Sequence, residues 1–140
     1  MREAVAELSD AALRRPERPG KWSVLQVVQH LADTELAYAY RMRMILAHDT
    51  PRIQAYDQDR WADRLRYNEV DLDDALAEFE TLRASNLRLL RGLSDDEWDR
   101  TGLHDERGPE SIRRIARMLA GHDLVHLRQI ERIKRAHDHA

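Results

Sequence analysis

The feature that most constrains this fold is the spacing of its apolar residues, which recur at steps of three and four along three long segments. In residues 24–48, 72–91 and 112–136 this spacing places the apolar side chains on one face of a helix. Alternating runs rich in Val, Ile and Thr are absent, as are Asn-Gly and Asp-Gly hairpin turns. We therefore expect an all-α protein without a sheet.

Helix start signals set the boundaries of these segments. Ser23 with Gln26 matches a capping box, in which the side chains of both residues accept backbone N–H groups of the first helical turn. Ser94 with Glu97 makes a second capping box, which opens a short helical turn after the third helix. Ser111 stands where the last helix begins and is expected to cap it.

A shorter first helix and a long connection complete the pattern. Residues 2–14 carry apolar residues at helical spacing and are followed by Pro16, which ends the helix. Residues 49–70 lack this spacing, and a connection of about twenty residues is long enough to let its flanking helices run parallel. We therefore expect residues 1–140 to form a single four-helix-bundle domain, with a long crossover loop between its second and third helices.

The composition excludes several classes of partner. The 140 residues are 42% hydrophobic and 35% charged, the net charge is −3, and arginines are interspersed with acidic residues. Such a mixture is typical of solvated helix faces rather than of a phosphate-binding stripe, so we expect no nucleic-acid partner. No apolar run approaches the roughly 18 residues of a membrane span, and the N-terminus has no apolar signal core. We expect a cytoplasmic protein without a membrane partner.

The chain contains no cysteine. Disulfides, cysteine-ligated zinc and a thiol nucleophile from the chain itself are therefore excluded. If the protein carries out sulfur chemistry, the thiol must come from a co-substrate.

Two histidines stand four residues apart on the apolar face of the last helical segment. His122 and His126 follow Ile115 and Leu119 on this face, and Ile133 continues it. A step of four residues advances about 6 Å and turns about 40°, so both imidazoles can point toward one position. They are either hydrogen-bonded core residues or two ligands of a metal ion, which binds the neutral imidazole. The pattern alone leaves both interpretations open.

His30 supplies a third candidate ligand from a second helix. It lies beside Leu31 and within one turn of Val27, so it flanks the inward face of its helix. Three histidines leave an open coordination position, as in catalytic zinc sites. The stretch HDLVH also has the spacing of the HExxH motif of zinc proteases, with Asp123 in place of the glutamate. That match is weak, because aspartate is shorter and the surrounding segments are all helical.

We expect the four remaining histidines to have roles other than metal binding. His48 lies at a helix end, where an interaction with the helix dipole is the simplest role. His104 lies in a loop between glycines, where we expect exposure to solvent. His137 and His139 lie near the C-terminus, where we expect the helix to fray.

Three segments together resemble the DinB-like superfamily, which includes the YfiT-type metal-dependent hydrolases. They are PGKWSVLQVVQHLADTE at 19–35, IQAYDQDRWA at 53–62 and GPESIRRIARMLAGHDLVHLRQI at 108–130. With the spacing between them, the resemblance covers nearly the whole chain. One departure is the first helix, which is shorter than the family pattern.

The resemblance implies a bundle with up-down-down-up topology and a divalent metal ion, zinc or nickel, near one end. The family's three ligand positions fall on His30, His122 and His126. Many members of the superfamily form homodimers. Some relatives are thiol-dependent S-transferases that use a low-molecular-weight bacterial thiol such as mycothiol or bacillithiol.

Two hypotheses about function follow, besides a purely structural bundle without metal. In the first, the metal activates a thiol or a water for attack on a small-molecule substrate, as a thiol S-transferase or a hydrolase does. In the second, the protein is a non-catalytic metal-binding or stress-related dimeric bundle. Candidate acceptors for the imidazole N–H groups are Asp33, Asp57 and Gln129. Tyr56 and Trp61 are candidates for lining the pocket.

Overall fold

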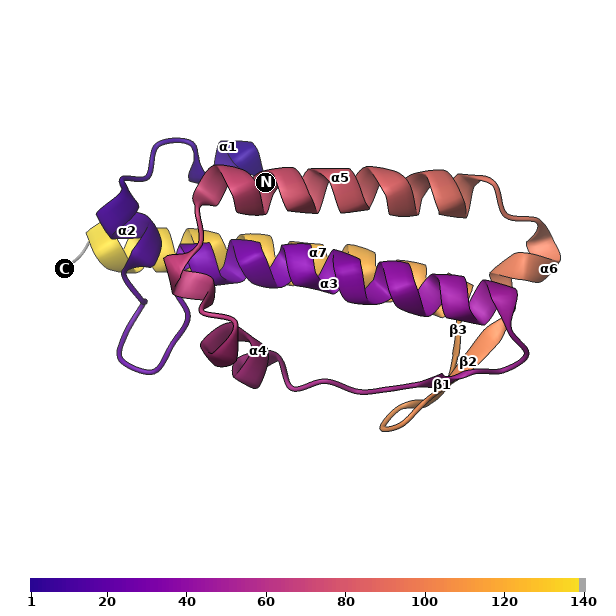
Figure 1. The fold of residues 1–140 in the computed structure, drawn as a ribbon. Helices are drawn as coiled ribbons and strands as arrows, with labels where there is room; N and C mark the ends of the chain where they lie inside the picture. Colours follow the sequence, from indigo (N-terminus) through magenta and orange to yellow (C-terminus); the bar gives the residue numbers. More distant parts are fainter. Residues whose placement is uncertain (139–140) are drawn as a thin grey trace.

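The computed structural model describes residues 1–138 and is built on three long helices, α3 (Val24–Ala47), α5 (Leu72–Arg91) and α7 (Ile112–Asp138) (Figure 1). Helices α3 and α5 run in the same direction, and α7 runs in the opposite one. Helix α3 packs against both of the others. The predicted helices over these three segments are confirmed, with boundaries that agree to within two residues.

The helix starts follow the predicted caps. The Ser23 hydroxyl accepts the N–H of Gln26 at 3.2 Å, and the Gln26 side chain accepts the N–H of Ser23 at 2.9 Å. The second capping box forms in the same way at the start of the short helix α6 (Asp95–Trp98). The Ser111 hydroxyl accepts the N–H of Arg114 at 3.1 Å in the first turn of α7. The predicted caps at Ser23, Ser94 and Ser111 are therefore confirmed.

The predicted continuous helix over residues 2–14 is wrong. This segment forms two short helices, α1 (Arg2–Val5) and α2 (Asp10–Arg14). The break occurs because Ser9 adopts an extended conformation and accepts the N–H of Ala12 at 3.2 Å, which starts a new helix. Residues 1–138 therefore contain three helices of 20 or more residues, and two short helices replace the predicted first one.

The expectations of an irregular 49–70 segment and of no sheet are also wrong. The connection contains β1 (Arg52–Ile53), α4 (Gln58–Arg64) and the 3₁₀ helix η1 (Tyr67–Glu69). Strand β1 pairs in parallel with β2 (Thr101–His104), which pairs antiparallel with β3 (Gly108–Ser111). These strands have only two to four residues, too few for an alternating pattern to be recognised in the sequence.

The apolar core consists of two clusters separated by polar side chains. The cluster near the termini contains Val24, Leu76, Ile130 and neighbouring residues, and the cluster near the sheet contains Met42, Ile45, Ile112 and neighbouring residues. Between them, α3 buries a run of polar side chains, and α7 contributes two histidines that face it. We call this region the polar layer and define it as His30, Asp33, Thr34, Glu35, His122 and His126.

No helix within residues 1–138 combines the length and the apolar composition needed to cross a membrane.

Candidate metal centre

Three imidazole rings from two helices converge in the polar layer. The Nε2 atom of His30, on α3, lies 3.1 Å from Nε2 of His122, on α7. The Nε2 atom of His126, one turn further along α7, lies 3.0 Å from the same His122 nitrogen. The structure thus brings together the three histidines that the sequence singled out. They lie in the interior of both helices, between the two apolar clusters, rather than near one end of the bundle.

Burial keeps these imidazoles neutral. The pKa of His30 is lowered to about 3, mainly because the ring is removed from water and also because of repulsion from the other two rings. The pKa of His122 is lowered to about 4 by burial and by repulsion from His126, and burial also lowers the pKa of His126. Near neutral pH, all three rings are therefore in the form that binds a metal ion.

Gln129 orients one of the rings. The Oε1 atom of Gln129 lies 2.7 Å from Nδ1 of His126, so this nitrogen donates its proton to the amide oxygen. The Nε2 atom then carries a lone pair that points toward the other two histidines. Of the three predicted acceptors, Gln129 is the one that contacts a histidine of the cluster.

The structure does not bring the other two predicted acceptors to the histidines. Asp33 accepts hydrogen bonds from the Tyr67 hydroxyl and from the Gln29 amide. Asp57 caps α4 and accepts the N–H groups of Asp59 and Arg60. In residues 1–138, neither carboxylate accepts a hydrogen bond from His30, His122 or His126.

The donor set and its geometry fit a divalent metal ion. In a tetrahedral zinc site with Zn–N bonds of about 2.0–2.1 Å, two ligand nitrogens lie about 3.3–3.4 Å apart. The two separations of 3.0 and 3.1 Å are a few tenths of an ångström shorter, so a small outward shift of the rings would accommodate an ion. The three histidines are also the group with metal-ligating spacing among residues 1–138.

Trp22 is a neighbour of the cluster that sequence reasoning missed as a site residue. Its ring centroid lies 4.9 Å from that of His30, and its ring stacks on His126 with centroids 6.5 Å apart and an interplanar angle of 13°. It directly precedes the Ser23 cap, which fixes it beside the first turns of α3. The sequence could have indicated its position, because Trp22 directly precedes the predicted cap of the helix that carries His30.

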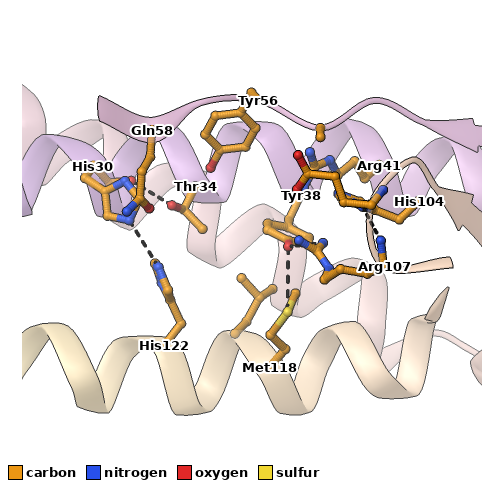
Figure 2. Close-up of a pocket in the computed structure, with 13 residues that line it drawn as sticks. His30, Thr34, Tyr38, Arg41, Tyr56, Gln58, His104, Arg107, Met118 and His122 are labelled. Atoms are coloured by element: carbon orange, nitrogen blue, oxygen red, sulfur yellow. Dashed lines mark hydrogen bonds between the residues drawn. The ribbon is translucent and has the colours of Figure 1, made fainter. Parts of the chain in front are cut away.

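A cavity of about 240 Å³ opens beside the histidines (Figure 2). His30 and His122 form one end of it, and Gln58 from the start of α4 lies over them. Tyr56 lines this cavity as predicted, whereas Trp61 stacks on Tyr56 with centroids 4.3 Å apart and lies outside the cavity lining. The remaining lining side chains are Thr34, Tyr38, Arg41, Ala55, His104, Glu106, Arg107, Met118 and Leu119.

The expectation that His104 is exposed is wrong. It ends strand β2, is 2% exposed and belongs to the cavity lining. The sequence could not show this because the strand that turns the ring inward is only four residues long. His48 forms the C-cap of α3, and His137 lies in the last turn of α7, while His139 lies outside the described residues.

Comparison with known protein families shows which family this chain belongs to. The sequence model described as the DinB superfamily matches residues 1–130. The chain belongs to the DinB superfamily. The predicted resemblance is thereby confirmed.

Individual relatives of this DinB-superfamily chain carry names that refer to metal-dependent hydrolysis. A protein of Oceanobacillus iheyensis named "Putative metal-dependent hydrolase OB0782" is 32% identical over 93% of this chain and 75% of its own length. "Putative metal-dependent hydrolase YfiT" of Bacillus subtilis is 33% identical over 76% of this chain. That alignment spans 60% of YfiT, so the chain corresponds to part of the length of this relative.

The solved structure of YfiT has the same fold. It superimposes with a TM-score of 0.90 at 29% identity, over 96% of this chain and 77% of YfiT. YfiT is described as "a probable metal-dependent hydrolase with an unusual four-helix bundle topology". The mostly helical fold of the DinB-superfamily chain is therefore shared with a protein described as a four-helix bundle.

Proposed function

We propose that His30, His122 and His126 hold a divalent metal ion, and that the adjacent cavity binds a small-molecule substrate of a metal-dependent hydrolase or thiol S-transferase. The observation that carries this proposal is that the Nε2 atoms of three neutral imidazole rings converge in a buried polar layer. A polar layer without a ligand would weaken the core, because buried imidazoles contribute less to stability than apolar side chains of similar size.

A divalent ion at this position supplies a Lewis acid that lowers the pKa of a water molecule or of a thiol. The chain itself supplies the orientation and the exclusion of solvent. Gln129 fixes the tautomer of His126, and Trp22 covers the rings on the side of the α3 start. His30 and His122 present their nitrogens at the end of the cavity, where a substrate can approach them.

The names of the relatives favour hydrolysis as the reaction. A thiol transfer would use the same site, and the absence of cysteine requires that its thiol be a co-substrate. Zinc and nickel are the proposed ions, because both accept imidazole ligands readily. Homodimer formation and a cytoplasmic location stay predictions.

The up-down-down-up topology is part of this proposal. Helices α3 and α5 point the same way and α7 points back, as that topology requires (Figure 1). In this arrangement, α1 and α2 together take the place of the first helix of the bundle. Both contribute a buried residue to the cluster near the termini, Val5 and Leu13.

The metal site is tested by mass spectrometry of the untagged protein. We expect about one equivalent of a divalent transition metal in the wild type and loss of that metal in the double variant His30→Ala, His122→Ala. A matched double variant, His48→Ala with His137→Ala, removes two histidines outside the cluster and is expected to keep the metal. Metal retained by the first variant would refute the assignment.

The type of reaction is tested separately on the metal-loaded protein. Ester and amide hydrolysis is measured in one panel, and conjugation of bacterial thiols to a model electrophile in another. Turnover that disappears after chelation and returns with the metal supports an enzyme. A metal-loaded protein without turnover in either panel would favour the non-catalytic bundle.

A further inference from the structure

Arg41 is a buried cation within the cavity, three turns of α3 away from His30. It is 6% exposed, and its guanidinium lies over the rings of Tyr38 and Tyr56, with distances of 4.9 and 5.2 Å to their centroids. One of its nitrogens donates to the carbonyl oxygen of Gln54 at 2.6 Å. Among residues 1–138 no carboxylate forms an ion pair with Arg41. A buried charge without a counter-ion is costly unless a ligand supplies one.

His104 adds an unsatisfied donor to the same end of the cavity. Its Nδ1 atom accepts the backbone N–H groups of Glu106 at 3.2 Å and of Arg107 at 3.3 Å. A nitrogen that accepts hydrogen bonds carries no proton, so the proton of this neutral ring lies on Nε2. That Nε2–H group is buried and has no partner within residues 1–138. It therefore needs an acceptor that the described chain does not provide.

Arg107 carries the second positive charge in this part of the cavity. Two of its nitrogens bind the buried carboxylate of Glu110 at 2.5 and 3.1 Å, so Glu110 balances its charge. The same guanidinium donates to the Tyr38 hydroxyl at 3.2 Å and so orients it. Glu106 also lines the cavity, but it is exposed, so solvent screens its charge. Arg41 is therefore the cavity cation that no carboxylate of residues 1–138 balances.

The cavity extends along one face of α3. His30, Thr34, Tyr38 and Arg41 follow one another at steps of four, four and three, and all four line the cavity (Figure 2). Eleven residues of helix correspond to a rise of about 16 Å. The histidines and Arg41 therefore lie at opposite ends of an elongated space.

We propose that the Arg41 end of this cavity binds a carboxylate of the substrate. Arg41 neutralises the carboxylate, the His104 Nε2–H donates to it, and the Tyr38 hydroxyl borders it. The substrate class is then a small, elongated organic acid whose reacting group lies at the histidines. The position of the reacting group rests on the proposed function, whereas the carboxylate site rests on Arg41 and His104 alone.

The test compares two probes of nearly equal shape, the anion hexanoate and the uncharged hexanamide. Their binding to the full chain, metal-loaded and metal-stripped, is followed by NMR through the side-chain nitrogen signals of Arg41 and His104. We expect both signals to shift with hexanoate, and we expect hexanoate to bind at least tenfold more tightly than hexanamide. This preference should persist after the metal is removed. Equal affinity for both probes, or no binding of either, would overturn the proposal.

Variants locate the preference. Arg41→Gln should reduce the hexanoate preference to less than threefold, whereas the control Arg88→Gln, at an exposed position of α5, should leave it unchanged. If the glutamine variant does not fold, Arg41→Lys replaces it in the same measurement. Lysine keeps the positive charge but not the planar guanidinium, so we expect a smaller preference for hexanoate than in the wild type. Preference retained in Arg41→Gln would contradict the assignment. Because metal content is measured independently, a failed metal site and a failed carboxylate site give different results.

Discussion

At the scale of single side chains, the candidate metal centre depends on which nitrogen of each imidazole carries the proton. The contact between Gln129 and Nδ1 of His126 leaves the Nε2 lone pair of that ring available. Acceptors of this kind orient metal-binding histidines and make them more basic. The sequence could predict this contact because residues three apart on a helix are neighbours. It could not predict the hydrogen bonds of Asp33 and Asp57, which depend on residues that only the fold brings near.

Replacing Gln129 by alanine should weaken metal binding without removing it. The His126 ring would then lose the partner that fixes its tautomer, and we expect affinity to fall by about 10- to 100-fold. Competition with a chromophoric chelator measures this affinity. Arg128→Ala changes the neighbouring exposed residue and should leave it unaltered. Equal affinities for the two variants would show that Gln129 has no such role.

The neutral histidines also make the metal-stripped protein sensitive to acid. His30 and His122 have folded-state pKa values of about 3 and about 4, below the ordinary 6.5 that applies in the unfolded chain. Between these values the unfolded state binds more protons, so the free energy of unfolding falls as the pH decreases from about 6.5 toward 4. Each ring contributes at most about 1.4 kcal/mol per pH unit.

Urea unfolding of the metal-stripped protein at several pH values checks this dependence. His30→Gln removes one of the two groups, so its free energy of unfolding should fall less steeply over the same pH range. The other titrating groups are common to both proteins and cancel in the comparison. Parallel pH dependences would mean that His30 titrates normally in the folded protein.

At the scale of elements, the small sheet is held against α3 by a glycine. A Cβ atom at Gly102 would lie 2.8 Å from Cγ1 of Ile45 and 2.9 Å from Cγ1 of Ile53. Strand β2 can approach the apolar cluster this closely only because position 102 has no side chain. The sheet therefore depends on one residue whose role is not visible in any periodicity.

Gly102→Ala should lower the free energy of unfolding by about 1–3 kcal/mol, because the added methyl group overpacks the core. Gly121, within α7, is the matched control, since nothing lies within 4 Å of a Cβ added there. Gly121→Ala should instead raise the free energy of unfolding by about 0.5–1 kcal/mol through its higher helix propensity. Chemical denaturation of both variants measures the two changes, and a Gly102→Ala protein as stable as the wild type would contradict the packing argument.

The elements differ in how far the sequence predicts them. The three long helices follow from apolar spacing and from caps such as Ser23, which act within a few residues. Strand β1 joins the sheet because Arg52 and Ile53 pair with Leu103 and His104, about fifty positions away, and no local pattern encodes that pairing. Strands β2 and β3 pair locally but are too short to show an alternating pattern. The sequence wrongly predicts an exposed His104 because the strand that it ends has only four residues.

At the scale of the whole molecule, an ionic cluster joins the three long helices. Arg83 on α5 donates to Glu35 on α3 at 2.6 Å and to Asp123 on α7 at 2.7 Å. Glu35 is 2% exposed in its side chain and also accepts from Asn86 at 2.8 Å. The role of Asp123 is therefore to bind Arg83, rather than to stand in for the glutamate of a protease motif.

Arg83→Met should be among the more destabilising single changes in this chain. It would leave the buried Glu35 carboxylate without its cation, and we expect a loss of about 3 kcal/mol. The control Arg88→Met, at an exposed position of the same helix, should change stability by less than about 0.5 kcal/mol. Thermal and urea unfolding check both values. If the two variants were equally stable, the cluster would contribute little to the fold.

The candidate cavity is the part that the sequence predicts least. His122 and His126 lie four residues apart on one face of α7, and His30 lies on the inward side of α3, so helical spacing predicts all three. The cavity instead combines α3, the connection around Tyr56 and Gln58, the end of β2 and α7. Arg41 and His104 gain their importance only from this assembly.

The parallel arrangement of α3 and α5 has a consequence for the order of folding. The two helices are neighbours, yet the chain must close the loop of residues 48–71 before they can meet. His30 and His122 are 92 residues apart, so their contact is among the least local in the molecule. Since closing such long loops costs entropy, we predict that the three-histidine site is still incomplete in the transition state for folding. A divalent ion bound by these histidines should therefore slow unfolding while leaving the folding rate nearly unchanged, as stopped-flow refolding and unfolding with and without metal would show.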